Sequence, residues 1–164
     1  MNNSINSTSP NFGAKVNLEE IAGRLKGKNP DAIKTFVETG TKDYPKDSFD
    51  FIACNNGDVK MLITGAKGIE ERALILKNAD FNKLIKTTSH NIADTFKLAC
   101  EILKDAITMD KKTTKEVDKA IKKGKIIEDS PEMDRMVEKA DDEVAKYVKE
   151  MLEDDEVLSK AKFL

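Results

Sequence analysis

The chain has 164 residues, of which 35% are charged and only 5% are aromatic, with no tryptophan. This length suits one domain with an appendage and is too short for two full cores. The formal net charge of -2 is too close to zero to indicate nucleic-acid or membrane binding by itself. With so few aromatic residues, the core is expected to be aliphatic, which favours helices packed on a small sheet.

The N-terminus carries no targeting signal that the sequence reveals. Residues 1–10 are rich in Asn, Ser and Thr, lack the basic and apolar regions of a secretory signal, and are expected to be disordered. The longest apolar run, from Ala73 to Leu76, falls far short of the roughly 20 residues that cross a membrane. The sequence therefore predicts a cytoplasmic protein without a membrane segment.

Three segments have the pattern of strands. Residues 11–16 and 48–54 alternate apolar and polar side chains, and residues 59–64 are apolar and β-branched. The Asn-Asn-Gly-Asp sequence at 55–58 is typical of a tight turn, so the second and third segments are predicted to form a hairpin. The first is expected to pair with one of its edges, giving a small antiparallel three-stranded sheet in an α+β fold. An edge left uncovered would invite strand addition by a partner.

Helices are predicted to cover this sheet. Asn17 and Asn29 are suitable N-caps for two short helices. The stretch after Gly68 is expected to be helical. Residues 80–107 carry apolar side chains at three- and four-residue steps, so a longer helix here should supply most of the core, with the polar cluster at 87–90 as a point where it could break.

The composition changes after Met109. Residues 111–125 contain seven lysines and two acids, whereas residues 128–156 contain thirteen acids and four basic residues. Capping patterns predict two helices here, a basic one beginning near Thr113 and an acidic one extending from Ser130 to about residue 162. The expected organisation has three parts: a disordered N-terminus at 1–10, an α+β domain at 11–109, and a charged helical tail at 110–164.

The acidic tail helix carries an apolar stripe at steps of three and four residues. Its members are Met133, Val137, Ala140, Val144, Tyr147, Met151 and Leu158. The stripe could pack on the protein's own helices, or it could bind a second copy or a different protein. Because Met and Ala make an adaptable surface suited to reversible association, these residues are the predicted protein-interaction site. The leading hypothesis is a non-enzymatic interaction or adaptor module.

Binding of nucleic acid or a phosphate ligand is the alternative. Its candidate residues are Lys67, in a glycine-rich turn at 65–68, and the basic-segment residues Lys115, Lys119, Lys122 and Lys123. The basic segment has no Arg and no aromatic residue, so base recognition is not indicated. A competing explanation is that the basic and acidic helices pair with each other.

The sequence contains no recognisable catalytic or metal-binding set, and no cofactor is expected. His90 is the only histidine, and Asp94 four residues on makes a helix-surface pair the simplest expectation. Cys54 and Cys100 lack the spacing of a redox or metal motif and are expected to be buried free thiols, with a disulfide as the alternative. An enzyme therefore ranks behind the two binding hypotheses.

Overall fold

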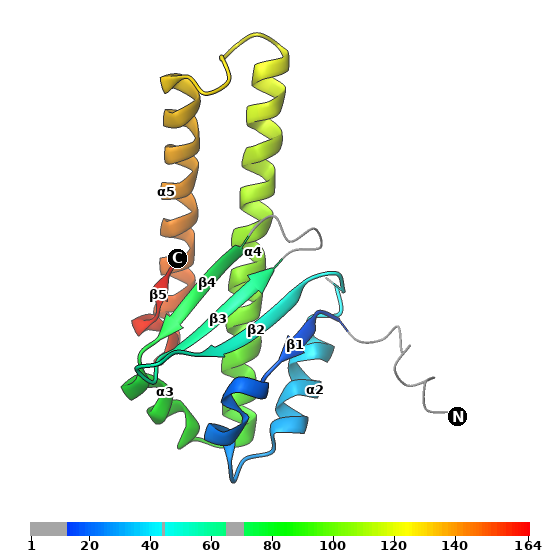
Figure 1. Cartoon of the computed structure of the whole chain (residues 1–164), viewed down its shortest axis with the longest axis vertical. Helices are drawn as coiled ribbons and strands as arrows, with labels where there is room; N and C mark the ends of the chain where they lie inside the picture. Colours follow the sequence, from blue (N-terminus) through cyan, green and yellow to red (C-terminus); the bar gives the residue numbers. More distant parts are fainter. Residues whose placement is uncertain (1–12, 44, 65–70) are drawn as a thin grey trace, which may run out of the picture.

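The computed structural model describes residues 13–43, 45–64 and 71–164, which form a mixed α+β fold of the predicted class. Figure 1 shows the arrangement. The elements in chain order are β1 (Lys15–Asn17), the 3-10 helix η1 (Glu19–Leu25), α2 (Pro30–Gly40), β2 (Ser48–Ala53), β3 (Val59–Thr64), β4 (Glu71–Leu76), α3 (Asn78–Ile85), α4 (Ser89–Lys122), α5 (Pro131–Glu153), the 3-10 helix η2 (Leu158–Lys160) and β5 (Lys162–Phe163).

The sheet has five strands in the order β1-β2-β3-β4-β5. The predicted hairpin of β2 and β3 is confirmed, with Phe51 opposite Met61 and Gly57 in the turn at a φ of 92°, which glycine adopts without strain. The predicted three-stranded antiparallel sheet is wrong in two respects. The N-terminal strand is β1, which pairs with β2 in parallel, and two further strands extend the sheet beyond β3.

β4 corrects the prediction of a helix after Gly68. The short apolar run at 73–76 fits both a strand and a buried helix, and its length does not decide between them. Pairing with β3 decides it, because all six residues of β4 find partners there. β4 therefore covers the whole β3 edge of the hairpin, while β1 covers residues 48–50 of the β2 edge. Residues 65–70, including the glycine-rich turn, lie outside the described residues.

The C-terminal region also differs from the prediction. The basic segment is the last part of α4 and no separate helix, and the Thr113 hydroxyl bonds to the Met109 carbonyl inside that helix instead of capping it. α5 ends at Glu153, because the Asp155 carboxylate accepts hydrogen bonds from the next turn at Val157 and directs the chain into η2 and β5. These last residues add a fifth strand to the sheet.

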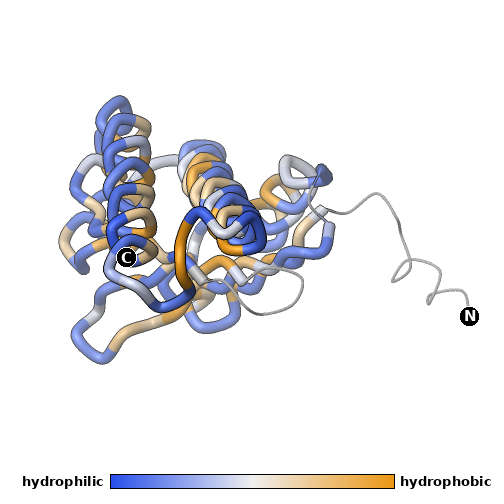
Figure 2. Tube along the Cα trace, turned by 90° about the horizontal axis from the view of Figure 1, so that it is seen from above, coloured by the Kyte–Doolittle hydropathy of each residue, from blue (hydrophilic) through white to orange (hydrophobic). Residues whose placement is uncertain are grey.

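The core lies between one face of the sheet and the helices α2, α4 and α5 (Figures 1 and 2). Phe51 of β2 packs on Phe96 of α4 with ring centroids 4.5 Å apart, and Leu103 is fully buried. The predicted break is confirmed, since Thr88 caps α4 by accepting from the Asn91 N–H. No helix of the described residues covers the opposite face of the sheet. Because many of its apolar side chains are buried against the sheet, α4 supplies much of the core, as expected.

Leu103→Ala should lower the free energy of unfolding by about 2 to 5 kcal/mol, because it leaves a cavity in a fully buried site. Leu98→Ala is the matched control on the same helix, where the side chain is only half-buried and the expected loss is about 1 kcal/mol. Urea denaturation of both variants measures the difference. Equal losses would contradict the placement of Leu103 at the centre of the core.

Candidate interaction site

Arg72 of β4 joins the sheet to both long helices. Its guanidinium donates to both carboxylate oxygens of Asp110 on α4, at 2.6 and 2.7 Å, and lies 3.4 Å from Asp141 on α5. The same group lies over the Phe163 ring of β5, 5.1 Å from its centroid. Residues 111–140, between these two aspartates, extend past the end of the sheet (Figure 1). We call this helical hairpin the arm.

The side chains of the arm are much less buried than those of the part of α4 that lies beside the sheet. Val117 is its only buried residue, whereas the part of α4 that faces the sheet buries most of its apolar side chains. The remaining apolar residues between the two helices of the arm are half-buried, and we call them the seam: Ala120, Ile121, Ile126, Met133, Met136, Val137 and Ala140. Two helices without a third layer cannot enclose a core. Ile127, at the connection, is 75% exposed.

The structure separates the predicted stripe into core residues, seam residues and the exposed Met151, and it places Leu158 on η2, beyond the end of α5. Val144 and Leu158 are buried in the core, and the Tyr147 hydroxyl donates to Asp105 of α4 at 2.7 Å. The other members lie elsewhere: Met133, Val137 and Ala140 belong to the seam, and Met151 is 38% exposed.

Sequence reasoning missed several residues that share these positions. Val148 and Leu152 are buried with Val144 at four-residue steps, a periodicity visible in the sequence. Met136 lies three residues after Met133 and four before Ala140 on α5, so the same periodicity shows it in the sequence. Ile126 lies in the connection, and only the course of the chain around the tip of the arm brings it to the seam. The boundary between core and seam depends on where the sheet ends, which the pattern of α5 alone does not show.

Four of the predicted anion-binding lysines share one surface. Lys115, Lys119, Lys122 and Lys123 line, with Asp118, a shallow hollow of about 430 Å³ on α4, and all four are exposed. Lys67 lies outside the described residues.

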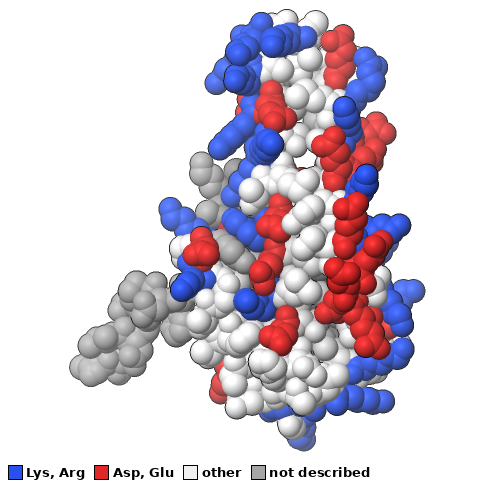
Figure 3. All heavy atoms as spheres, turned by 180° about the vertical axis from the view of Figure 1, so that it is seen from behind, with Lys and Arg blue, Asp and Glu red and all other residues white. Residues whose placement is uncertain are grey.

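The basic and acidic segments fold back and pack on each other, as the competing explanation expected, but no ion pair joins them in the described structure. Among the residues that the structure describes, no lysine Nζ at 111–125 lies within 4 Å of a carboxylate oxygen at 128–156. Lys115 and Lys119 are each two residues from the buried Val117, about 200° around the helix, so they point away from α5. Figure 3 shows basic side chains gathered over the end of α4, whereas α5 carries acidic side chains with basic ones among them.

The reactive residue types lie apart from one another. Cys54 and Cys100 are both free thiols. Cys100 is buried as expected, and burial raises the pKa of its thiol well above its usual value. Cys54 is only half-buried, so the expectation that it is buried is wrong. His90 Nε2 lies 3.2 Å from Asp94 on the surface of α4, the predicted pair. Among the described residues no group of three His, Cys, Asp or Glu side chains is placed to hold a metal ion, and no helix combines the length and apolarity of a membrane span.

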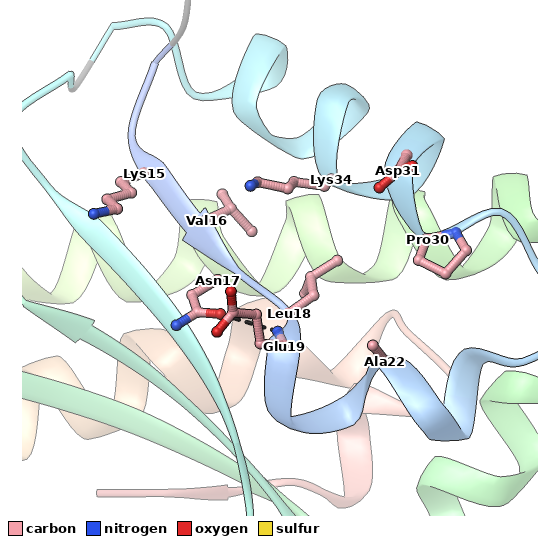
Figure 4. Close-up of a pocket in the computed structure, with 9 residues that line it drawn as sticks. All are labelled: Lys15, Val16, Asn17, Leu18, Glu19, Ala22, Pro30, Asp31 and Lys34. Carbon is pink, nitrogen blue, oxygen red and sulfur yellow. Dashed lines mark hydrogen bonds between the residues drawn. The ribbon is translucent and has the colours of Figure 1, made fainter. Parts of the chain in front are cut away.

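A hollow of about 490 Å³ lies between β1, η1 and α2 (Figure 4). Val16 and Leu18 form its apolar part, and Lys34 of α2 extends toward Val16. The charged side chains at its rim carry both signs and are all exposed. The outward backbone N–H of Val16 already donates to the Glu38 carboxylate at 3.3 Å. This hollow therefore defines no particular ligand and offers little to an added strand.

The sequence matches no protein-family model, and comparison with curated proteins and with solved structures found no similar chain.

Tyr147 provides a pH-dependent test of the contact between α4 and α5. The hydrogen bond to Asp105 raises the pKa of Tyr147, so the folded state holds this proton more tightly than the unfolded state. The resulting stability is complete below the unfolded pKa of about 10 and is lost as the pH rises through the folded value. Tyr147→Phe should therefore be less stable than the wild type by about 0.5 to 1 kcal/mol at neutral pH.

This difference should shrink above about pH 10, because the unfolded state of the wild type then loses the tyrosine proton first. Chemical denaturation of the two proteins across the pH range measures it. A constant difference up to high pH would show that the hydrogen bond to Asp105 does not form in solution.

Proposed function

We propose that the chain is a non-enzymatic protein-interaction module whose binding surface is the arm, residues 111–140. The observation that carries this proposal is the half-buried seam between two helices that extend past the sheet. Fully burying a large apolar side chain stabilises a structure by roughly 1.5 to 3 kcal/mol, and half-burial leaves much of that unrealised. A partner helix laid along the seam would complete the burial.

The division of the stripe supports this choice of surface. Val144 and Leu158 hold α5 to the body, so their side chains are not accessible to a partner. Met133, Val137 and Ala140 keep exposed area, and Ile127 adds an exposed apolar side chain at the connection. Exposed lysines and acids surround the seam, where they would set the orientation and the rate of association more than the affinity.

Ile127→Glu tests the arm as the binding surface. The change places a charge where an apolar contact is proposed, and it leaves the fold intact because the side chain is already 75% exposed. Leu164→Glu is the matched control, with an apolar side chain 44% exposed outside the arm. The wild-type chain and each variant are immobilised separately, and the proteins captured by each are cross-linked and compared. The Ile127→Glu chain should capture about tenfold less than the wild type, and the Leu164→Glu chain should capture the same amount. Equal retention by both variants would remove the arm as the surface.

Anion binding through the lysines of α4 is the second candidate function. It is favoured by one observation, the exposed hollow that Lys115, Lys119, Lys122 and Lys123 share. Lysines that neutralise phosphates give an affinity that falls as salt rises. Changing all four to Gln should reduce both the affinity for nonspecific RNA or DNA and its salt dependence. A wild-type chain that binds neither nucleic acid at low salt would exclude this function.

A further inference from the structure

We infer that the partner of the arm is a second copy of this chain. In this dimer two arms lie side by side about a two-fold axis parallel to their length, so that α4 of each copy faces α5 of the other. The inference rests on the proposed function and adds the identity of the partner. It is carried by the distribution of charge on the arm and by the position of the sheet.

The face of the arm opposite the sheet is free to form such a contact. Figure 2 shows the sheet on one side of α4 and α5, so in the described structure the body does not obstruct the other side. Figure 3 views that side directly and shows a band of uncharged residues running between the two helices. The seam residues Ala120, Met136 and Ala140 are half-buried, so part of their apolar surface remains exposed between the helices. Two such faces brought together would form a four-helix bundle.

The two sides of the arm carry opposite net charges, so each side is complementary to the other side of a second copy. Residues 111–125 on the α4 side carry a net charge of +5, while residues 128–140 on the α5 side contain five acids and two basic residues, a net charge of -3. These lysines and acids are exposed and do not neutralise one another within the chain. A two-fold axis along the band places the basic side of each arm against the acidic side of the other, twice. Pairing α4 with α4 would instead bring like charges together, which disfavours association.

The apolar contacts agree with the same arrangement. Both tips lie at the same end of such a dimer, so the two exposed Ile127 side chains come close to each other. The seam residues of four helices then face a common core. An interface of this kind has the pattern of an isologous contact, in which one surface recognises itself.

A charge-exchange experiment tests the inference. One variant changes Lys112, Lys115 and Lys119 of the arm to Glu. The other changes Glu138 of the arm, and Asp142 and Glu143 directly after it on α5, to Lys. We call these two the arm variants. All six side chains are exposed, and none makes an ion pair or side-chain hydrogen bond within the described structure. Lys119 lies in the last turn of α4 and the other five lie in helix interiors. A control variant changes Lys26, Lys34 and Lys46 to Glu, exposed positions outside the arm, and has the same net charge as the first variant. Circular dichroism checks that every variant is folded.

Sedimentation equilibrium measures the association. The wild type and the control should approach twice the chain mass of 18.3 kDa as concentration rises, whereas each arm variant alone should associate about tenfold or more weakly. An equimolar mixture of the two arm variants should recover association, because each then supplies the charge that the other lacks. A variant that folds poorly alone is replaced by its Gln equivalent, which should weaken association in the same direction.

The inference is overturned if the wild type stays monomeric at high concentration, or if the arm variants associate as strongly as the wild type. If the wild type is monomeric yet proteins are still captured in an Ile127-dependent manner, the partner is a different protein and the proposed function stands. If capture also fails to depend on Ile127, both the function and the inference fall.

Discussion

The ion pair between Arg72 and Asp110 determines where α4 and α5 pass from the core into the arm. A guanidinium that donates two parallel hydrogen bonds to one carboxylate is held in a single orientation, and here the pair is largely shielded from solvent. The hydrogen bond with Asp110 raises the pKa of Arg72, which keeps its guanidinium charged. Because Arg72 also reaches Asp141 and Phe163, one side chain of the sheet touches α4, α5 and β5. On one side of this point the helices form the core, and on the other side they form the arm.

α4 consequently has two parts with different surroundings along one continuous helix. Its first part packs on the sheet and on α2, and Lys104 holds the nearly buried carboxylate of Asp47 at 2.6 Å. Its last part has only α5 as a neighbour among the described helices, so its apolar side chains remain partly in water. A helix that is anchored firmly at one end holds the other end in a defined position. This rigidity would lower the entropy that a partner loses when it binds the seam.

The sequence predicted those features that short-range chemistry determines. Asn-Gly identified the turn of the β2–β3 hairpin, Asn29 with Pro30 marked the start of α2, and Thr88 lies where the predicted helix breaks. β4 and β5 were missed because short segments fit more than one pattern, and tertiary pairing decides between them. The parallel pairing of β1 depends on contacts between distant parts of the chain.

The sequence predicted which residues contribute to the candidate site but not how they are arranged. The lysines of the basic segment and the apolar stripe of α5 are visible in the sequence, but the division of the stripe between core and seam is not. That division depends on where the sheet ends relative to the helices, which Arg72 and its two aspartates define. The orientation of Lys115 and Lys119 away from α5 follows from the burial of Val117, which became clear only with the packing.

Amide hydrogen exchange along α4 and α5, measured in dilute and in concentrated solution, tests the division into core and arm most directly. In dilute protein, amides in the arm should exchange faster than those of the same helices beside the sheet, because fewer buried contacts stabilise them. At high concentration the arm should gain protection while the rest of α4 does not change. Equal protection along the whole of α4 at both concentrations would contradict the account.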